Sequence, residues 1–320
     1  MSAISSSKTL TGFIICMVAG IFWGTFGTFV KLMTNYGFTE SAIAILGPAM
    51  MVIFYAIKAY CKNPQLFLVN RQQLIVLIIV GVLAVIGSNW CYAVALGKGL
   101  PLAVASIITF LNYYLVIIGA RIIWKNKITP VKILSGIAVI GGISLILDVF
   151  GTLTATAAGL FWMGLTVCGF AAGYLLVRHA MDIGIDTDIY LAYTNLFGII
   201  GLSFINPPWD VVSEVIANTQ AFGLPAVLAL LGFGLIPQVA SFYLLLEGYN
   251  YLEPALVVIV YSSFDPITVS ILGYLLFGET LTMLQILGII IVLGAIIWLQ
   301  LAEQAEERKL AQQNKVSLVE

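Results

Sequence analysis

The stretch PALVVIVYSSFDPITVSILGYLLF, residues 254 to 277, is one unbroken apolar run with a single charged residue, Asp265, near its middle. A helix of about 20 apolar residues is long enough to cross the roughly 30 Å hydrocarbon core of a bilayer. The run is therefore predicted to be a membrane-spanning helix. An acid at its centre is the feature that needs a reason, because a carboxylate at that depth costs several kcal/mol unless it faces a partner or water.

The composition of the whole chain gives the same class. Of its 320 residues, 61% are hydrophobic and 9% are charged, whereas soluble proteins have about 45–50% apolar and about 25% charged residues. We predict an all-α polytopic membrane protein whose surroundings are the lipid bilayer. The net charge of −1 and the absence of a basic stripe argue against nucleic acid as a partner.

Apolar runs separated by charged or turn-rich segments predict ten transmembrane helices. An even number places both termini on one side of the membrane. Twelve of the 14 basic residues fall on that side, and only Lys31 and Lys98 fall opposite, so the positive-inside rule predicts cytoplasmic termini in the cell inner (cytoplasmic) membrane. The predicted spans are 10–33, 41–60, 73–97, 102–123, 130–149, 155–178, 188–205, 223–246, 254–277 and 281–302.

Two connecting segments have their own predictions. Residues 206–222 form the longest external connection, which is either a short amphipathic helix on the outer interface or an ordered loop. Residues 303–320 are a polar tail, expected to be a solvated helix extension on the cytoplasmic side.

A repeat divides the chain into two five-helix halves. Sliding the sequence by 153 residues aligns Ser88 with Ser241 and Pro101 with Pro254, and the register continues to Gly141 with Gly294. Because five is odd, the second half enters the membrane in the opposite direction, as in carriers built from inverted repeats. The fold predicted is thus ten transmembrane helices as two inverted five-helix repeats, 10–149 and 155–302, which suits alternating access.

Three motifs then carry a resemblance to a known family: FWG (Phe22 to Gly24), the following Lys31, and FGETLTMLQILGIIIVLGAII (Phe277 to Ile297). With the ten-span layout, they resemble the EamA type of the drug/metabolite transporter superfamily, over nearly the whole chain. The resemblance implies a carrier without choosing among amino acids, amines, sugars, nucleotide sugars and drugs. In the first half WKNK replaces the Gly-Glu pair, so we expect Glu279 to cap a helix at an interface rather than bind substrate.

Polar and aromatic residues near the bilayer midplane are the predicted substrate-binding set. Asp265 aligns with Asn112 across the repeat, and a negative charge among aromatic rings suits a cation or an amino-bearing zwitterion. Pro266 is expected to bend its helix and expose backbone groups. The predicted substrate-binding residues are Asp265, Asn112, Tyr261, Trp23, Asn89, Tyr92, Gln238 and Ser241.

Asp265 is also the predicted coupling residue. A carboxyl group removed from water favours its neutral form, which permits proton-coupled exchange. The competing interpretation is that Asn112, Ser262 or Ser263 holds Asp265 as a packing device. Lys31 is expected to reach the headgroups rather than Asp265.

The functional prediction is a secondary transporter of a small polar or cationic metabolite. Alternatives are a sugar or nucleotide-sugar carrier of the same superfamily, or a non-transporting membrane sensor or assembly protein that reuses the fold. An enzyme is not expected, since a mid-span aspartate without a nearby histidine supplies neither a nucleophile and base nor a metal set. The four cysteines have no CxxC spacing, so no cofactor or metal is predicted, and the oligomeric state stays open.

Overall fold

The computed structural model describes residues 2–125, 128–147, 155–252 and 254–317, which are helical with no strand among them. Lys127, the predicted boundary at residue 149 and the last three residues of the tail lie outside this part. The helices are α1 (Ser2–Gly24), α2 (Phe26–Asn35), α3 (Glu40–Lys62), η1 (Pro64–Phe67), α4 (Arg71–Val80), η2 (Gly81–Cys91), α5 (Tyr92–Gly97), α6 (Leu102–Thr109), α7 (Asn112–Trp124), α8 (Pro130–Ile146), α9 (Ala157–Asp182), α10 (Thr187–Leu202), α11 (Pro208–Phe222), α12 (Leu224–Phe233), η3 (Gly234–Ala240), α13 (Ser241–Gly248), α14 (Pro254–Phe277) and α15 (Met283–Ser317).

Eight helical segments of the described chain are long and apolar enough to span a membrane, and α8 is a shorter apolar helix. The all-helical membrane prediction is therefore confirmed. The remaining predicted span, 188–205, corresponds to α10, which has 16 residues and is not among the eight. The number ten consequently stays a prediction.

Capping side chains begin several of these helices where the sequence leaves an apolar run. Asn70 and Gln73 form a reciprocal capping box at the start of α4, and the Thr156 hydroxyl accepts a hydrogen bond from the Gly159 N–H at the start of α9 (3.0 Å). Such caps satisfy backbone donors that have no partner inside the helix. Inside the spans the backbone bonds to itself, which a bilayer requires.

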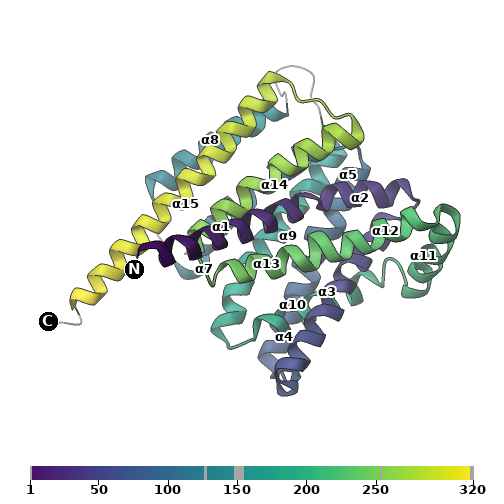
Figure 1. Cartoon of the computed structure of the whole chain (residues 1–320), viewed down its shortest axis with the longest axis horizontal. Helices are drawn as coiled ribbons and strands as arrows, with labels where there is room; N and C mark the ends of the chain where they lie inside the picture. The colour runs from purple at the N-terminus through teal and green to yellow at the C-terminus, as the bar shows by residue number, and fades with distance from the viewer. Residues whose placement is uncertain (1, 126–127, 148–154, 253, 318–320) are drawn as a thin grey trace.

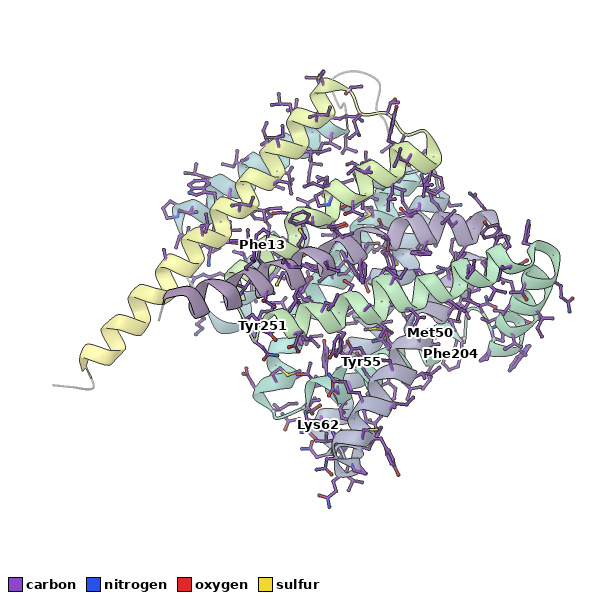
Figure 2. All side chains as sticks on the ribbon, in the orientation of Figure 1. Phe13, Met50, Tyr55, Lys62, Phe204 and Tyr251 are labelled. Carbon is purple, nitrogen blue, oxygen red and sulfur yellow. The ribbon has the colours of Figure 1, made fainter. Side chains whose placement is uncertain are left out.

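The bundle is arranged so that the two ends of the chain lie on one side. α1 begins and α15 ends on the left of Figure 1, whereas α11 lies on the opposite side. We call the opposite side, where α2 and α14 end, the far end. Apolar side chains cover the outside of the bundle, and Phe204 is 88% exposed (Figure 2). An apolar exterior is what a lipid-facing protein needs.

Contacts fix the relative directions of several helices. Lys62 at the end of α3 pairs with Asp186 at the start of α10, and Ser41 at the start of α3 accepts from Asn206 beyond the end of α10 (3.0 Å). These two helices run antiparallel. α8 and α15 are also antiparallel, because Gln285 near the start of α15 donates to the carbonyl of Ile146 at the end of α8 (3.1 Å).

Glycines let α1 and α14 pack closely and parallel. A Cβ on Gly12 would lie 2.8 Å from Leu252 Cγ, just before α14, and a Cβ on Gly24 would lie 2.7 Å from Thr268 Cβ. The Gly24 contact includes the Asp265 carbonyl oxygen at 2.8 Å. Small residues at such crossings permit close backbone approach, so α1 is seated directly against the acid-bearing turn of α14.

Two π-helical segments occupy related positions in the two halves. η2 begins at Gly81 and η3 begins at Gly234, residues that the predicted offset of 153 equates. Gly81 packs against α10, where a Cβ would lie 2.7 Å from Phe197 Cβ, and Gly234 packs against Met50 of α3. π-Helical turns inside helices are frequent at functional sites.

The predicted connection 206–222 is a helix, so the loop alternative is wrong. Val211 of α11 is buried while Trp209 is 71% exposed. The Glu214 carboxylate accepts hydrogen bonds from the N–H and hydroxyl of Thr39, which attaches α11 to the start of α3.

Candidate functional site

Two helices are interrupted in the middle of the bundle, and their broken ends meet at the candidate site. The first predicted span divides at Thr25 into α1 and α2, and the Thr25 hydroxyl donates to the Phe22 carbonyl (2.7 Å). The fourth divides at residues 110–111 into α6 and α7. Irregular backbone at membrane depth is tolerated where it is buried in protein or lines a cavity.

A cavity of about 20 Å³ lies beside these interruptions. That volume is enough for roughly one water molecule, so the site in this conformation is closed around a space smaller than a metabolite. Its lining combines aromatic rings, two hydroxyls and one acid. The lining residues are Trp23, Phe26, Gly27, Tyr92, Ser106, Thr109, Phe170, Asp265 and Val269.

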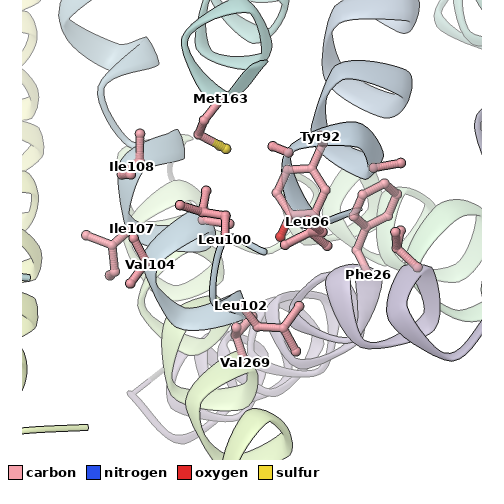
Figure 3. Packing of buried hydrophobic residues seen from close by; sticks show 14 of the residues in the cluster. Phe26, Tyr92, Leu96, Leu100, Leu102, Val104, Ile107, Ile108, Met163 and Val269 are labelled. Carbon is pink, nitrogen blue, oxygen red and sulfur yellow. The ribbon is translucent and has the colours of Figure 1, made fainter. Parts of the chain in front are cut away.

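Aromatic rings from four elements form a connected wall around the cavity. Trp23 stacks on Phe26 with ring centroids 5.3 Å apart, and it also meets Phe170 in a T-shaped contact at 6.2 Å. Phe26 meets Tyr92 edge-on at 5.2 Å. Figure 3 shows Phe26 beside Tyr92, and Val269 beside Leu102. Ring faces of this kind attract cations.

Asp265 supplies the only formal charge of the cavity lining. It is 8% exposed, and no basic residue in the described chain forms an ion pair with it. Lys31, the basic residue of the first predicted span, forms its ion pair with Glu279 and not with Asp265. A buried carboxylate without a fixed counter-charge is an unfavourable state that a bound cation or a proton relieves.

The three groups considered as packing partners of Asp265 make other hydrogen bonds. Ser262 pairs with the Tyr113 hydroxyl (2.9 Å), Ser263 donates to the Ile259 carbonyl (2.7 Å), and the Asn112 amide donates to the Thr109 carbonyl (2.6 Å). The packing interpretation therefore has no support from these residues.

Ser106 places its hydroxyl beside the Asp265 carboxylate in the cavity wall. Its side chain is 4% exposed, and within the described chain its Oγ makes no hydrogen bond of standard length and angle. Buried polar atoms are normally paired, so an unpaired one in a cavity wall is a candidate ligand contact. The neighbouring Thr109 hydroxyl donates to the Ala105 carbonyl (2.8 Å) and keeps its acceptor lone pairs.

The structure brings three of the eight predicted residues to the cavity: Trp23, Tyr92 and Asp265. Tyr261 is next to them, with its ring centroid 6.5 Å from that of Trp23. The others bond to protein groups elsewhere: Gln238 donates to Asn89 (2.9 Å), Ser241 to the Ala19 carbonyl (2.9 Å), and Asn112 as described above.

Six lining residues were not predicted: Phe26, Gly27, Ser106, Thr109, Phe170 and Val269. Phe26 and Gly27 follow the predicted Trp23 within one turn, which was a usable signal. Thr109 lies three residues before Asn112, one turn away. Val269 lies four residues after Asp265, also one turn away, whereas Ser106 and Phe170 are not marked by their spacing in an apolar run.

α14 is continuous through Pro266, so the bend expected there stays a prediction. A proline removes one intrahelical hydrogen bond, and packed transmembrane helices tolerate this. The interruption occurs instead beside Asn112, the residue that the repeat aligns with Asp265.

A larger groove of about 650 Å³ lies between α3 and the η3–α13 segment, lined by Phe54, Ile57, Lys58, Val239, Ala240 and Tyr243. Its one charged group, Lys58, is paired with Asp188 (2.8 Å), and Ile57 and Tyr243 are exposed on the bundle surface. With its charge neutralised, this groove lacks the unmatched polar groups of the Asp265 cavity. The described residues contain no group of three or more His, Cys, Asp or Glu that could hold a metal ion.

Residues 10–148 and 157–301 each match the model of the EamA-like transporter family. A solved structure described as the crystal structure of a protein is similar, with a TM-score of 0.60 and 12% identity over 93% of this chain and 99% of that chain. This identity supports a shared fold alone. No match was found among the curated proteins.

Proposed function

The chain belongs to the EamA-like transporter family, and we propose that it is a secondary carrier of a small cationic or amino-bearing metabolite. The observation that carries this proposal is the Asp265 carboxylate, buried without an ion-pair partner in the described chain and lining a cavity with Trp23, Phe26, Tyr92 and Phe170. Charge pairing and cation–π attraction of roughly 0.5 to 2 kcal/mol per ring would act together on a positive group.

Alternating access follows from the size of the cavity. A space of about 20 Å³ cannot hold a metabolite, so substrate enters only after the surrounding helices part. Tyr261, Asn89, Gln238, Ser241 and Asn112 then become reachable and complete the opened site. The substrate would bind these groups from one side of the membrane and be released to the other side.

Two inverted five-helix repeats, with ten crossings in total, would perform this motion. Their support is the direction of equivalent helices. α3 and α10 are the second spans of the two predicted halves, and α8 and α15 are the fifth spans. Each pair runs antiparallel, as inversion requires and as a direct repeat would not produce.

The carrier is placed in the cytoplasmic membrane with both termini inside, as the distribution of basic residues indicates. The far end of the bundle then faces outward. Transport is coupled to protons: when the cation leaves, Asp265 takes up a proton, and the next cation displaces it. Each cycle thereby exchanges one proton for one positive charge.

Binding is tested first by thermal unfolding of the purified protein with amines, quaternary ammonium compounds, amino acids and sugars. A ligand at 100 times its Kd stabilises the native state by about 2.7 kcal/mol. Cations are expected to raise the unfolding midpoint of the parent and of Asp210→Asn, a variant on exposed α11, but not of Asp265→Asn. A shift with sugars alone would favour the sugar carrier.

Coupling is tested in liposomes with the best ligand of that screen. An inside-acid pH gradient is expected to drive its accumulation by the parent and by Asp210→Asn. Asp265→Asn, which is not expected to bind the cation, should show no accumulation in response to the gradient. Equal responses of parent and Asp265→Asn would show that this carboxyl does not carry the proton.

A further inference from the structure

Glu279, at the far end, connects three elements through one carboxylate. Its oxygens accept hydrogen bonds from the Lys31 ammonium and from the backbone N–H of Leu102, the latter at 3.1 and 3.2 Å. The Lys31 ammonium also lies 5.1 Å from the centre of the Phe277 ring. Both charged side chains are mostly buried, with 24% and 17% of their surface exposed. We call Lys31, Glu279 and the Leu102 N–H the far-end cluster.

Each of the three connected elements carries part of the cavity wall. Lys31 is on α2 with Phe26 and Gly27, and Leu102 begins α6, which carries Ser106 and Thr109. Glu279 follows directly after α14, which carries Asp265 and Val269. α2 and α6 belong to the first matched region and Glu279 to the second, so the cluster joins the two repeats across the cavity.

The bonds of the cluster depend on one another. Pro101, the residue that precedes α6, offers no side-chain cap, so Glu279 is the group that satisfies the Leu102 N–H. A carboxylate at a helix N-terminus is favoured by the helix dipole, and its ion pair with Lys31 adds a charge-assisted bond. If Glu279 withdraws, a buried ammonium and a buried N–H lose their acceptor together. The cluster therefore favours a fully formed or a fully separated state.

The two other ion pairs of the described chain lie elsewhere. Lys58–Asp188 and Lys62–Asp186 connect α3 with α10, and no residue of α3 or α10 lines the Asp265 cavity. Lys62 ends α3, whereas Glu40, which begins it, lies beside Gly97 near the far end. The cavity can therefore open away from the far end without separating an ion pair that joins its own walls.

The geometry points to Glu279 as the gate residue on the external side of the carrier. Its ion pair with Lys31 and its cap on α6 hold the cavity shut at the far end, and their separation admits solute from outside. The external position of this gate rests on the proposed function, which places the far end outside the cell. Glu279 is a positioning residue, since it touches none of the cavity.

The test measures external access to the cavity and requires no substrate. A reporter cysteine replaces Val269 in a chain whose exposed Cys61 and Cys168 are serine. A membrane-impermeant maleimide is added outside intact cells. The parent reporter is expected to react slowly. Glu279→Gln should raise the rate by about ten-fold or more, the ratio corresponding to loss of one bond to a charged group.

Two further variants separate gating from a general loss of structure. Glu214→Gln is the matched control, because Glu214 also accepts from a backbone N–H at the far end, that of Thr39, and it should leave the rate unchanged. Lys31→Gln keeps the Glu279 cap on α6 and should accelerate labelling less than Glu279→Gln. If Glu279→Gln fails to fold, the gate is tested by comparing the labelling rates of Lys31→Gln and Glu214→Gln. Faster labelling of Lys31→Gln supports the gate, and equal rates oppose it.

Equal labelling of parent, Glu279→Gln and Lys31→Gln would overturn the gate. Faster labelling only when the reagent is admitted from the cytoplasmic side of inverted vesicles would overturn it as well. Failure of the proposed function gives a different result: cations then leave the unfolding midpoint unchanged, while the labelling rates still depend on Glu279.

Discussion

The crossing of α9 over η2 offers a prediction whose size follows from the coordinates. A Cβ on Gly169 would lie 2.7 Å from Gly87 Cα, 2.8 Å from its carbonyl carbon and 2.9 Å from the Ser88 nitrogen. All three are backbone atoms that cannot rotate away. Nonbonded carbons sit about 3.5–4.0 Å apart, so Gly169→Ala requires the two helices to separate by about 0.8 Å or more. Overpacking of this kind costs about 1–3 kcal/mol.

Gly164→Ala on the same helix is the matched control. No atom lies within 4 Å of a Cβ at that position. Both substitutions remove a glycine from the interior of α9 and gain about 0.5–1 kcal/mol from the lower backbone entropy of alanine. That gain cancels in the comparison, so the difference in unfolding free energy between the two variants is the cost of overpacking at the crossing, about 1–3 kcal/mol.

Thermal unfolding in detergent, followed by tryptophan fluorescence, measures this difference. At roughly 2 °C per kcal/mol for a chain of this size, Gly169→Ala is expected to unfold about 2–6 °C below Gly164→Ala. Because Phe170 follows Gly169 and lines the cavity, the same variant should weaken ligand-induced stabilisation. Identical midpoints for the two variants would refute the close crossing.

Three further outcomes are expected. Gly27→Ala should fold, since its Cβ would meet only side-chain ends at 2.8 Å, but its methyl group would fill the cavity and abolish the thermal shift with cations. Although burial of its carboxyl opposes the effect, the hydrogen bond from Lys62 lowers the pKa of Asp186. The stabilisation by this ion pair is complete above the unfolded-state pKa of about 4 and is lost as the pH falls below that value. Asp186→Asn should therefore flatten the acid limb of a curve of unfolding midpoint against pH. Gln238→Leu should lower stability by about 1–3 kcal/mol by leaving the Asn89 oxygen unpaired, and the double variant with Asn89→Leu should recover part of that loss in denaturant titration.

Sequence reasoning located the helices because the bilayer makes the local pattern decisive. Each span must satisfy its own backbone, so an apolar run such as residues 254–277 becomes a helix almost regardless of its neighbours. The same reasoning found Asp265, since a lone acid in such a run is conspicuous. Trp23 and Tyr92 were found as polar-tipped rings near the same depth. All three line the cavity.

The direction in which each side chain faces within the bundle was harder to predict, because in these spans it depends on tertiary contacts. Ser106 and Phe170 lie in runs that are apolar on every side, where periodicity does not distinguish lipid from cavity. The interruption at residues 110–111 falls in a stretch without glycine or proline, whereas Pro266 lies in a continuous helix. The pair of Lys31 and Glu279 joins residues 248 positions apart, and no local pattern encodes that partnership.

The repeat itself explains why the site carries one acid and not two. Asn112 and Asp265 occupy equivalent positions, and a carboxylate at both would place like charges around one small cavity, which forces one of them to stay protonated. The Asn112 amide nitrogen bonds locally, because Asn112 begins α7 at the helix interruption and donates to the Thr109 carbonyl there (2.6 Å), whereas its Oδ1 has no hydrogen-bond partner within the described chain. A carboxylate cannot donate, and no basic residue of the described chain forms an ion pair with Asp265. The two equivalent positions therefore differ: Asn112 bonds to the backbone of the interrupted helix, and the proposed exchange of a cation for a proton would take place at Asp265 alone.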